Sequence, residues 1–264
     1  MNMSEPLQFN LGLRGQLLHD EPMARHTSWR TGGRAARCYV PADTADLAAF
    51  LRALPADEAV CFVGLGSNLL VRDGGFAGTV ILMHDTGATL RLDGELVHAT
   101  AGVAAPKVAR FAARHDLQGA EFLAGIPGTL GGALAMNAGC YGSETKDVLV
   151  SAWGLTRAGE RVDYALADFG YTYRHSQAPA DILWVEAVYR GTPDAPEAVQ
   201  ARIDEITSRR ETTQPIREKT GGQYFLLMHG DATEVRAAHA ACFRVTAGRQ
   251  HVDKMLTGIA LLEQ

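Results

Sequence analysis

The sequence predicts a mixed α/β protein, with a large body that ends near residue 192 and a smaller, helix-rich piece after it. Short β-branched runs bounded by glycine alternate with helical patterns through the body. Pro193 and Pro196 then open a segment, 193–211, in which helical spacing dominates. Hydrophobic residues make up 47% of the 264 residues, so a sizeable core can be buried. We therefore divide the chain into residues 1–192 and 193–264.

Local signals place the elements in order along the body. Residues 43–54 predict a helix, because Asp43 or Thr44 can cap the apolar spacing that follows. A hairpin is expected at 88–100, turning around Asp93-Gly94, a pair that favours tight turns. Further elements are a helix at 105–116 and buried strands at 59–63, 79–83, 148–156 and 182–191.

Composition argues against several classes of partner. The net charge is −5, from 25 basic and 30 acidic residues, which disfavours nucleic acid or an anionic membrane. No secretory signal is visible in MNMSEPLQFN, and no apolar run approaches the ~20 residues of a membrane span. The four cysteines have neither CxxC nor zinc spacing, and the histidines lack metal-ligand spacing. We expect reduced thiols, no metal site and a cytoplasmic protein.

Two glycine-rich loops are the strongest functional signal: VGLGSNLLVRDGG (63–75) and AGIPGTLGGALAMNAGCYG (124–142). Glycine lets the backbone approach a ligand and turn its N–H groups toward phosphate oxygens. A helix that starts after Thr129 would add its N-terminal amides to this anion site. Glycines also make ordinary tight turns, but two such loops favour a nucleotide or dinucleotide cofactor. The P-loop lysine is absent, and Leu69 stands where GxGxxG needs its third glycine, so neither common motif applies.

The order of the motifs is similar to that of a known family. RHTSWRTGG (25–33), VGLGSNLLVRDGGFAG (63–78), EFLAGIPGTLGGALAMNAGCYG (121–142) and YTYRHS (171–176) resemble UDP-N-acetylenolpyruvoylglucosamine reductase, the MurB family. These are flavoproteins of peptidoglycan synthesis, also called UDP-N-acetylmuramate dehydrogenases. The resemblance implies an α+β, FAD-binding fold of the vanillyl-alcohol-oxidase (PCMH) type. Residues 1–192 would form its two α/β lobes, N-terminal helix included, and 193–264 a truncated substrate-binding domain.

The resemblance also implies which residues contact FAD. The pyrophosphate would be received by Gly64, Gly66, Ser67 and Asn68. The other expected cofactor contacts are Arg30, Thr31, Leu69, Ile126, Pro127, Gly128, Thr129, Gly132, Asn137 and Gly139. NADPH is the expected reductant, and a small-molecule UDP-sugar is the expected substrate.

The family's chemistry needs a cation and a proton donor. Hydride from NADPH passes through the flavin to the vinyl carbon of an enolpyruvyl ether, which creates a carbanionic centre beside a carboxylate. A guanidinium can stabilise that centre, since it is permanently charged and offers two donors. By resemblance, Arg174 is the catalytic arginine and Tyr173 is its neighbour at the site.

The C-terminal piece departs from the family at the proton donor. RRETTQPIREKTGG (209–222) matches, but Gln223 stands where the family has its donor serine, and the FKNP segment that follows there is missing. An amide cannot donate a proton as an activated hydroxyl can, whereas the adjacent Tyr224 is a candidate substitute donor. The family's second general acid is a glutamate, and Glu263 stands one place out of register with it.

Three hypotheses about function follow. The first is a reductase of this family with impaired activity, and the second is a non-catalytic FAD-binding or regulatory relative in cell-wall metabolism. The third is a flavin oxidase with another substrate, which the absence of a recognisable flavin-linking motif disfavours. Whether the protein is an enzyme is left open by the sequence. We expect the piece from about 194 onward to pack on the body or on a second subunit, in a possible homo-oligomer or with a cell-wall enzyme partner.

Overall fold

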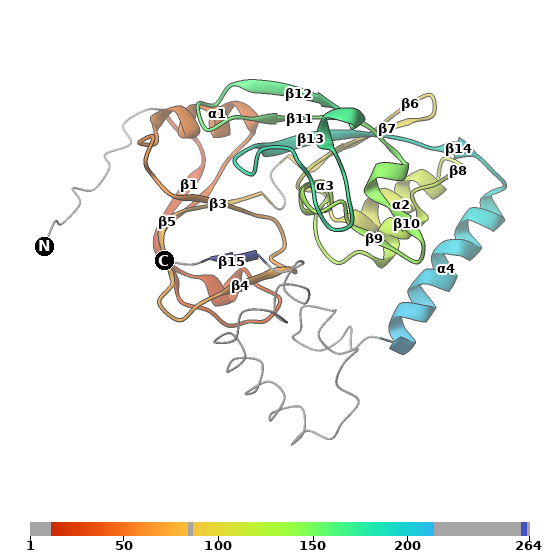
Figure 1. Cartoon of the computed structure of the whole chain (residues 1–264), viewed down its shortest axis with the longest axis horizontal. Coiled ribbons are helices and arrows are strands. Elements are labelled where there is room, and N and C mark those ends of the chain that lie inside the picture. Colours follow the sequence, from red (N-terminus) through yellow and green to blue (C-terminus); the bar gives the residue numbers. More distant parts are fainter. Residues whose placement is uncertain (1–11, 84–86, 214–259, 263–264) are drawn as a thin grey trace, which may run out of the picture.

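The computed structural model describes residues 12–83, 87–213 and 260–262 and arranges them around two β-sheets (Figure 1). Each sheet forms one lobe with the helices packed on it, so the architecture is mixed α and β, as predicted. Among these residues, none of the helices combines the length and the apolar character that crossing a membrane requires.

The first lobe is a four-stranded sheet in the order β1-β2-β5-β3. Its strands are β1 (Gln16–Pro22), β2 (Arg34–Val40), β3 (Val60–Val63) and β5 (Phe76–Leu82). β1 is antiparallel to β2, whereas β2, β5 and β3 run parallel. The helix α1 (Thr44–Ala53) connects β2 to β3 and begins after Asp43, whose carboxylate accepts a hydrogen bond from the Asp46 N–H at 2.8 Å. Asp43 is therefore the N-cap, and the predicted helix and the two predicted strands are confirmed.

The second lobe is a five-stranded sheet in the order β12-β11-β13-β7-β6, with every pair antiparallel. Its strands are β6 (Leu90–Asp93), β7 (Leu96–Thr100), β11 (Leu149–Leu155), β12 (Arg161–Ala165) and β13 (Leu183–Arg190). β6 and β7 form the predicted hairpin around Asp93-Gly94. Its helices are α2 (Ala105–Ala113), which was predicted, and α3 (Leu130–Ala135).

The two lobes share buried apolar contacts through α1. Leu47, Phe50 and Leu51 pack with Ile81 of the first sheet and with Leu183 of the second. On the second sheet, residues of α2 and α3 form a further large core with side chains of β7 and β13. The lobes are therefore held against each other through α1.

Short elements fill the connections. The 3-10 helices are η1 (Met23–Arg25), η2 (Glu121–Gly125), η3 (Thr145–Asp147) and η4 (Leu166–Phe169). Three small ladders pair β8 (Leu117–Gln118) with β14 (Thr192–Pro193), β9 (Gly139–Cys140) with β10 (Ser143–Glu144), and β4 (Leu69–Val71) with β15 (Ala260–Leu262). The pairing of β15 with β4 is parallel and brings residues 260–262 beside the first glycine loop.

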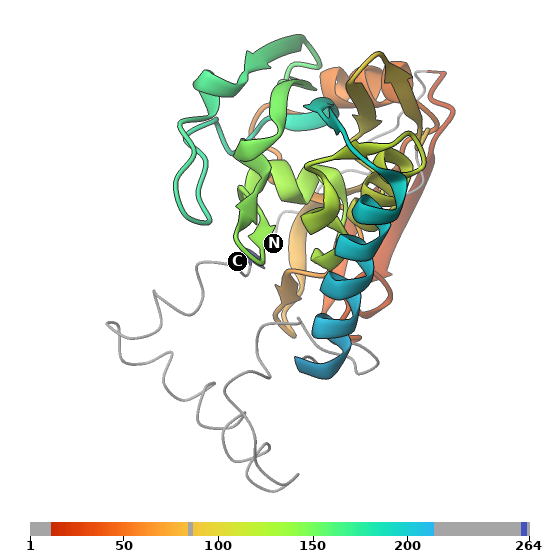
Figure 2. The ribbon, with the colours of Figure 1, turned by 90° about the vertical axis from the view of Figure 1, so that its right-hand side faces the viewer.

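The last described helix, α4 (Pro196–Thr213), lies along the second lobe (Figures 1 and 2). It starts at Pro196, as the sequence indicated, and it buries Val199 and Ile203. Ile203 belongs to the same core as the residues of α2 and α3. The described part of the C-terminal piece thus packs on the body, while a domain boundary near residue 192 stays a prediction.

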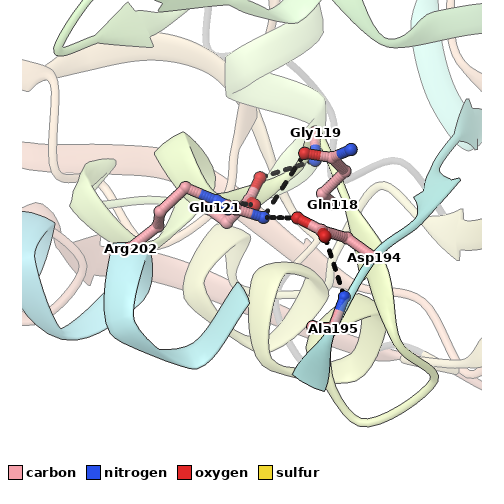
Figure 3. Close-up of polar contacts among 6 residues, drawn as sticks. All are labelled: Gln118, Gly119, Glu121, Asp194, Ala195 and Arg202. Carbon is pink, nitrogen blue, oxygen red and sulfur yellow. Dashed lines mark hydrogen bonds and ion pairs between the residues drawn. The ribbon is translucent and has the colours of Figure 1, made fainter. Parts of the chain in front are cut away.

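A polar cluster fixes α4 to the body (Figure 3). The Arg202 guanidinium contacts the carboxylates of Glu121 and Asp194, each at 2.7 Å. Glu121 is only 8% exposed and also accepts the Gly119 N–H at 2.6 Å. Because Glu121 opens η2, which leads into the second glycine loop, this cluster connects α4 to that loop.

Two expectations concern the ends of the chain. The first described element is β1, and residues 1–11 lie outside the described residues, so the N-terminal helix stays a prediction. Gln223, Tyr224 and Glu263 also lie outside them.

Candidate functional site

The two glycine loops line a cleft of about 510 Å³ between the lobes. Phe62 and Met83 contribute apolar wall from the first lobe, and Ile182 and Trp184 contribute it from the second. The predicted cofactor residues that line the cleft are Gly64, Gly66, Ser67, Asn68, Leu69, Ile126, Pro127, Gly128, Thr129, Gly132 and Gly139. Loops that are 60 residues apart in the sequence therefore form one surface.

Direct contacts join the two loops. The Ser67 hydroxyl donates to the Pro127 carbonyl at 2.7 Å. A Cβ at Gly64 would overlap the Thr129 hydroxyl, and a Cβ at Gly128 would lie 2.7 Å from the Ser67 oxygen. Gly128 also has φ +133°, which side chains rarely adopt. The close approach of the loops thus depends on glycine, and it leaves backbone rather than side chain facing much of the cleft.

The segment with RHTSWRTGG lies behind the first loop. The Ser28 N–H donates to the Gly66 carbonyl at 3.1 Å, and a Cβ at Gly66 would overlap the His26 carbonyl. Arg30 and Thr31 are outside the lining of the cleft: Arg30 donates to a backbone carbonyl at 3.3 Å, and the Thr31 carbonyl accepts from a threonine hydroxyl at 3.1 Å. Their contacts with FAD stay predictions.

The helix expected after Thr129 is present as α3, but its first amides do not form the expected anion site. The Leu130 N–H donates to the Val103 carbonyl and the Gly131 N–H donates to the Ala101 carbonyl, both at 2.9 Å. These donors are therefore used by the segment between β7 and α2. The expectation is therefore wrong for these two amides, because carbonyls of a distant segment accept them, whereas a contribution of later α3 amides to an anion site stays a prediction.

Arg174 lies at the edge of the cleft, on a turn that follows η4. Its guanidinium donates to the Gly139 carbonyl at 2.9 Å, and its φ is +54°. Tyr173 is 77% exposed and lies beside Arg174, with the guanidinium carbon 5.7 Å from the ring centre. The structure thus brings Arg174 to the glycine loops and leaves Tyr173 open to solvent.

The second loop also contains Asn137, which the sequence indicated as a cofactor contact, and Cys140, which the sequence did not single out. Asn137 is 1% exposed and lies outside the lining of the cleft, so its contact with FAD stays a prediction. Cys140 lines the cleft, its thiol donates to the Phe122 carbonyl at 3.0 Å, and burial raises the pKa of that thiol to about 11. No motif around Cys140 distinguishes it from its neighbours. Within 12–83 and 87–213, no three histidine, cysteine or carboxylate side chains come together as a metal site.

The fit of the cleft to FAD can be tested on the glycines. Backbone at Gly64, Gly66 and Gly128 lies where any side chain would collide, and a Cβ at Gly132 would meet nothing within 4 Å. Backbone-lined glycine turns beside an apolar wall suit a pyrophosphate and a flat ring system. The residues present therefore fit a dinucleotide flavin cofactor.

Comparison with known proteins agrees with this site. The family described as "FAD binding domain" matches residues 35–165. A UDP-N-acetylenolpyruvoylglucosamine reductase from Phenylobacterium zucineum is 53% identical over 216 residues, covering 81% of this chain and 72% of that protein. One from Alkalilimnicola ehrlichii is 51% identical over 224 residues, covering 82% of this chain and 73% of that protein.

A solved structure is similar over most of the chain. The crystal structure of UDP-N-acetylenolpyruvylglucosamine reductase (MurB) from Thermus caldophilus matches with a TM-score of 0.65 at 28% sequence identity. The match covers 76% of this chain and 71% of that chain. The predicted FAD-binding fold, the FAD cofactor and the predicted family are confirmed. This chain belongs to the UDP-N-acetylenolpyruvoylglucosamine reductase family.

Proposed function

We propose that this protein reduces the enolpyruvyl ether of a UDP-sugar in peptidoglycan synthesis, with NADPH as reductant, and that proton transfer limits the rate. The carrying observation is one cleft that combines the backbone of both glycine loops with the Arg174 guanidinium. When bound, FAD supplies the ability to accept a hydride and to deliver it to the substrate.

Each part of the cleft has a separate task in this proposal. The glycine loops bind the cofactor's pyrophosphate through backbone N–H groups, and the apolar wall excludes water from its ring. The Arg174 guanidinium binds the substrate carboxylate and stabilises the negative charge that develops next to it. The Tyr173 ring, whose centre lies 5.7 Å from the guanidinium carbon, supports this cation.

In this proposal the slow step is proton donation, because Gln223 stands where the family has its donor serine. Gln223 has no proton of suitable acidity, and general acid catalysis contributes roughly 10²–10⁴-fold to rate. Tyr224 is the candidate substitute, since a phenol can donate when it is held near the carbanion. We also infer a cytoplasmic location, supported by four cysteines that have neither CxxC nor zinc spacing. A homo-oligomer or a cell-wall enzyme partner stays a prediction.

A second candidate function rests on the same residue. If Gln223 leaves no usable acid, the protein is a non-catalytic FAD-binding relative in cell-wall metabolism. The two candidates differ in what happens after the flavin has been reduced.

The deciding experiment adds NADPH and then the enolpyruvyl substrate to the protein under anaerobic conditions, while the flavin absorption band is followed. NADPH should bleach the band, and the substrate should restore it roughly 10²–10⁴-fold more slowly than in the Gln223→Ser variant, where the hydroxyl is returned. Rapid recovery that collapses in Tyr224→Phe would instead assign proton donation to Tyr224. A band that never recovers, even in Gln223→Ser, would favour the non-catalytic candidate. A protein that takes up no FAD would refute both.

A further inference from the structure

Arg174 occupies a strained position in a tight turn. Thr172 and His175 exchange two backbone hydrogen bonds, at 3.0 and 3.3 Å, so that Tyr173 and Arg174 form the corner. Arg174 has φ +54° there, a left-handed conformation that is unfavourable for an L residue other than glycine. Such a conformation persists only where the surroundings hold it.

The side chain of Asn137 holds this turn. Its amide nitrogen donates to the Thr172 carbonyl at 3.0 Å and to the Glu144 carboxylate at 2.8 Å. Its amide oxygen accepts the Lys146 N–H at 3.0 Å. These partners fix which way the amide points, since two of them accept and one donates. Both N–H donors of Asn137 are used, so none is left for a cofactor.

Glu144 keeps the amide in place. The hydrogen bond from the Lys146 ammonium, which lies 2.8 Å from the carboxylate, holds the pKa of Glu144 below its ordinary value, and the Asn137 amide acts in the same direction. Glu144 therefore remains an ionised acceptor for Asn137 at neutral pH.

The contacts close a ring around Arg174. Asn137 holds Thr172, two residues before Arg174, and the Arg174 guanidinium holds the carbonyl of Gly139, two residues after Asn137. The turn and the second glycine loop thus fix each other at two points. Breaking the Asn137 contact removes the side chain that ties the turn to the second loop at Thr172, and leaves the bond from Arg174 to Gly139 as the remaining tie.

We propose that Asn137 is a positioning residue for Arg174: its buried amide sets the turn that aims the guanidinium at the substrate carboxylate. The proposal rests on the proposed function, because the carboxylate in question is that of the enolpyruvyl substrate. It assigns Asn137 a role in the substrate half of the site instead of a contact with FAD.

Three variants separate this role from general damage. Asn137→Ala removes the amide and leaves a side chain at φ +42°, whereas Asn137→Gly removes the amide and relieves the backbone. Thr145→Val is the matched control: Thr145 is also fully buried, and its hydroxyl donates to the Ala138 carbonyl at 2.8 Å without touching the turn.

Crystal structures of the FAD-loaded variants give the first measurement. In both Asn137 variants, Arg174 should leave its left-handed conformation and lose the bond to the Gly139 carbonyl. In Thr145→Val, both features should persist. Retention of the Arg174 geometry in the two Asn137 variants would overturn the proposal.

The second measurement is a titration with the enolpyruvyl substrate, without NADPH, in which the flavin absorption band reports binding. FAD content should match that of the wild type, while the substrate Kd should rise about 10- to 100-fold, the loss typical of a charge-assisted hydrogen bond. The double variant with Arg174→Ala should lose no more than Arg174→Ala alone. An equal loss in Thr145→Val would overturn the proposal. A wild-type protein that binds no such substrate would count against the proposed function, and the crystal structures would then still decide the role of Asn137.

Discussion

The two glycine loops line the same cleft but are held in different ways. The first loop is fixed by backbone: Gly66 accepts from the Ser28 N–H at 3.1 Å, and the Gly33 and Gly75 N–H groups both donate to the Arg72 carbonyl at 2.9 Å. A Cβ at Gly66 or Gly75 would overlap a carbonyl oxygen of the segment behind. The first loop therefore depends on the absence of side chains.

The second loop also makes backbone hydrogen bonds, at Leu130 and Gly131, but side chains that reach it from elsewhere hold it in addition. The Tyr171 hydroxyl donates to the Leu134 carbonyl at 2.7 Å, and the Arg174 guanidinium donates to the Gly139 carbonyl at 2.9 Å. Each of these bonds can be lost singly. We therefore expect a substitution at the first loop either to abolish FAD uptake and lower stability strongly or to have almost no effect. Substitutions around the second loop should weaken FAD binding and stability only in part.

The largest effect is expected for Gly66→Ala. The new Cβ would overlap the His26 carbonyl, which is backbone and cannot rotate away, and φ +62° is unfavourable for alanine. We expect loss of FAD uptake and a decrease of about 3 kcal/mol or more in the free energy of unfolding. Flavin fluorescence and urea denaturation measure the two.

The control lies in the same loop. A Cβ at Gly74 would meet nothing within 4 Å, so Gly74→Ala should change stability by less than about 0.5 kcal/mol and leave FAD uptake intact. If Gly66→Ala behaved like Gly74→Ala, the backbone support of the first loop would be refuted.

A smaller effect is expected for Arg202→Met, which acts on the second loop through η2. Glu121, which is 8% exposed, would keep the Gly119 N–H as its one remaining partner among the described residues (Figure 3). The loss of charge-assisted bonds should cost about 1–3 kcal/mol, and FAD affinity should fall in part only. Arg91→Met is the matched control, because the pair of Arg91 with Asp93 is long, 3.9 Å, and exposed, and should contribute less than about 1 kcal/mol. Equal losses in the two variants, by urea denaturation, would contradict the coupling of α4 to the loop.

This contrast also explains which features the sequence could predict. α1 with Asp43 as its cap, the hairpin around Asp93-Gly94 and the cleft between the glycine loops follow from local signals or from the resemblance. The pairing of β1 with β2 was missed, because QLLHDEP and RAARCYV are poor in β-branched residues and acquire their structure from each other.

The side-chain support of the second loop could not be predicted either, because it too depends on segments that are far apart in the sequence. Asn137 meets Thr172 across 35 residues, and Arg202 meets Glu121 across 81. The first amides of α3 were expected at an anion site, yet carbonyls of a distant segment take them. Such partners are set by tertiary packing, which a single sequence does not display.

Gly132→Ala should raise the stability of the protein slightly, in contrast to the losses expected for Gly66→Ala and Arg202→Met. Gly132 is inside α3, its Cβ would meet nothing within 4 Å, and alanine is the better helix former. The FAD-free protein should gain about 0.5–1 kcal/mol in free energy of unfolding. Because Gly132 lines the cleft, the added methyl should also weaken FAD binding, measured by fluorescence titration. Unchanged affinity would mean that the cofactor does not reach α3.

The smallest effect concerns the reactivity of Cys140 and leaves the fold intact. Burial disfavours the thiolate and raises the pKa of this thiol to about 11 from its ordinary value of 9.0. At pH 8 the folded protein should therefore be alkylated at Cys140 about 100-fold more slowly than the urea-denatured chain, since only the thiolate reacts. Raising the pH from 8 to 10 should accelerate labelling of the folded protein about 100-fold but labelling of the denatured chain only about 10-fold, because the denatured thiol approaches full ionisation at pH 10. Iodoacetamide labelling followed by peptide mass spectrometry measures both rates. Because Cys140 lines the cleft, bound FAD should slow the labelling further. Equal labelling rates with and without FAD would show that the cofactor does not cover Cys140.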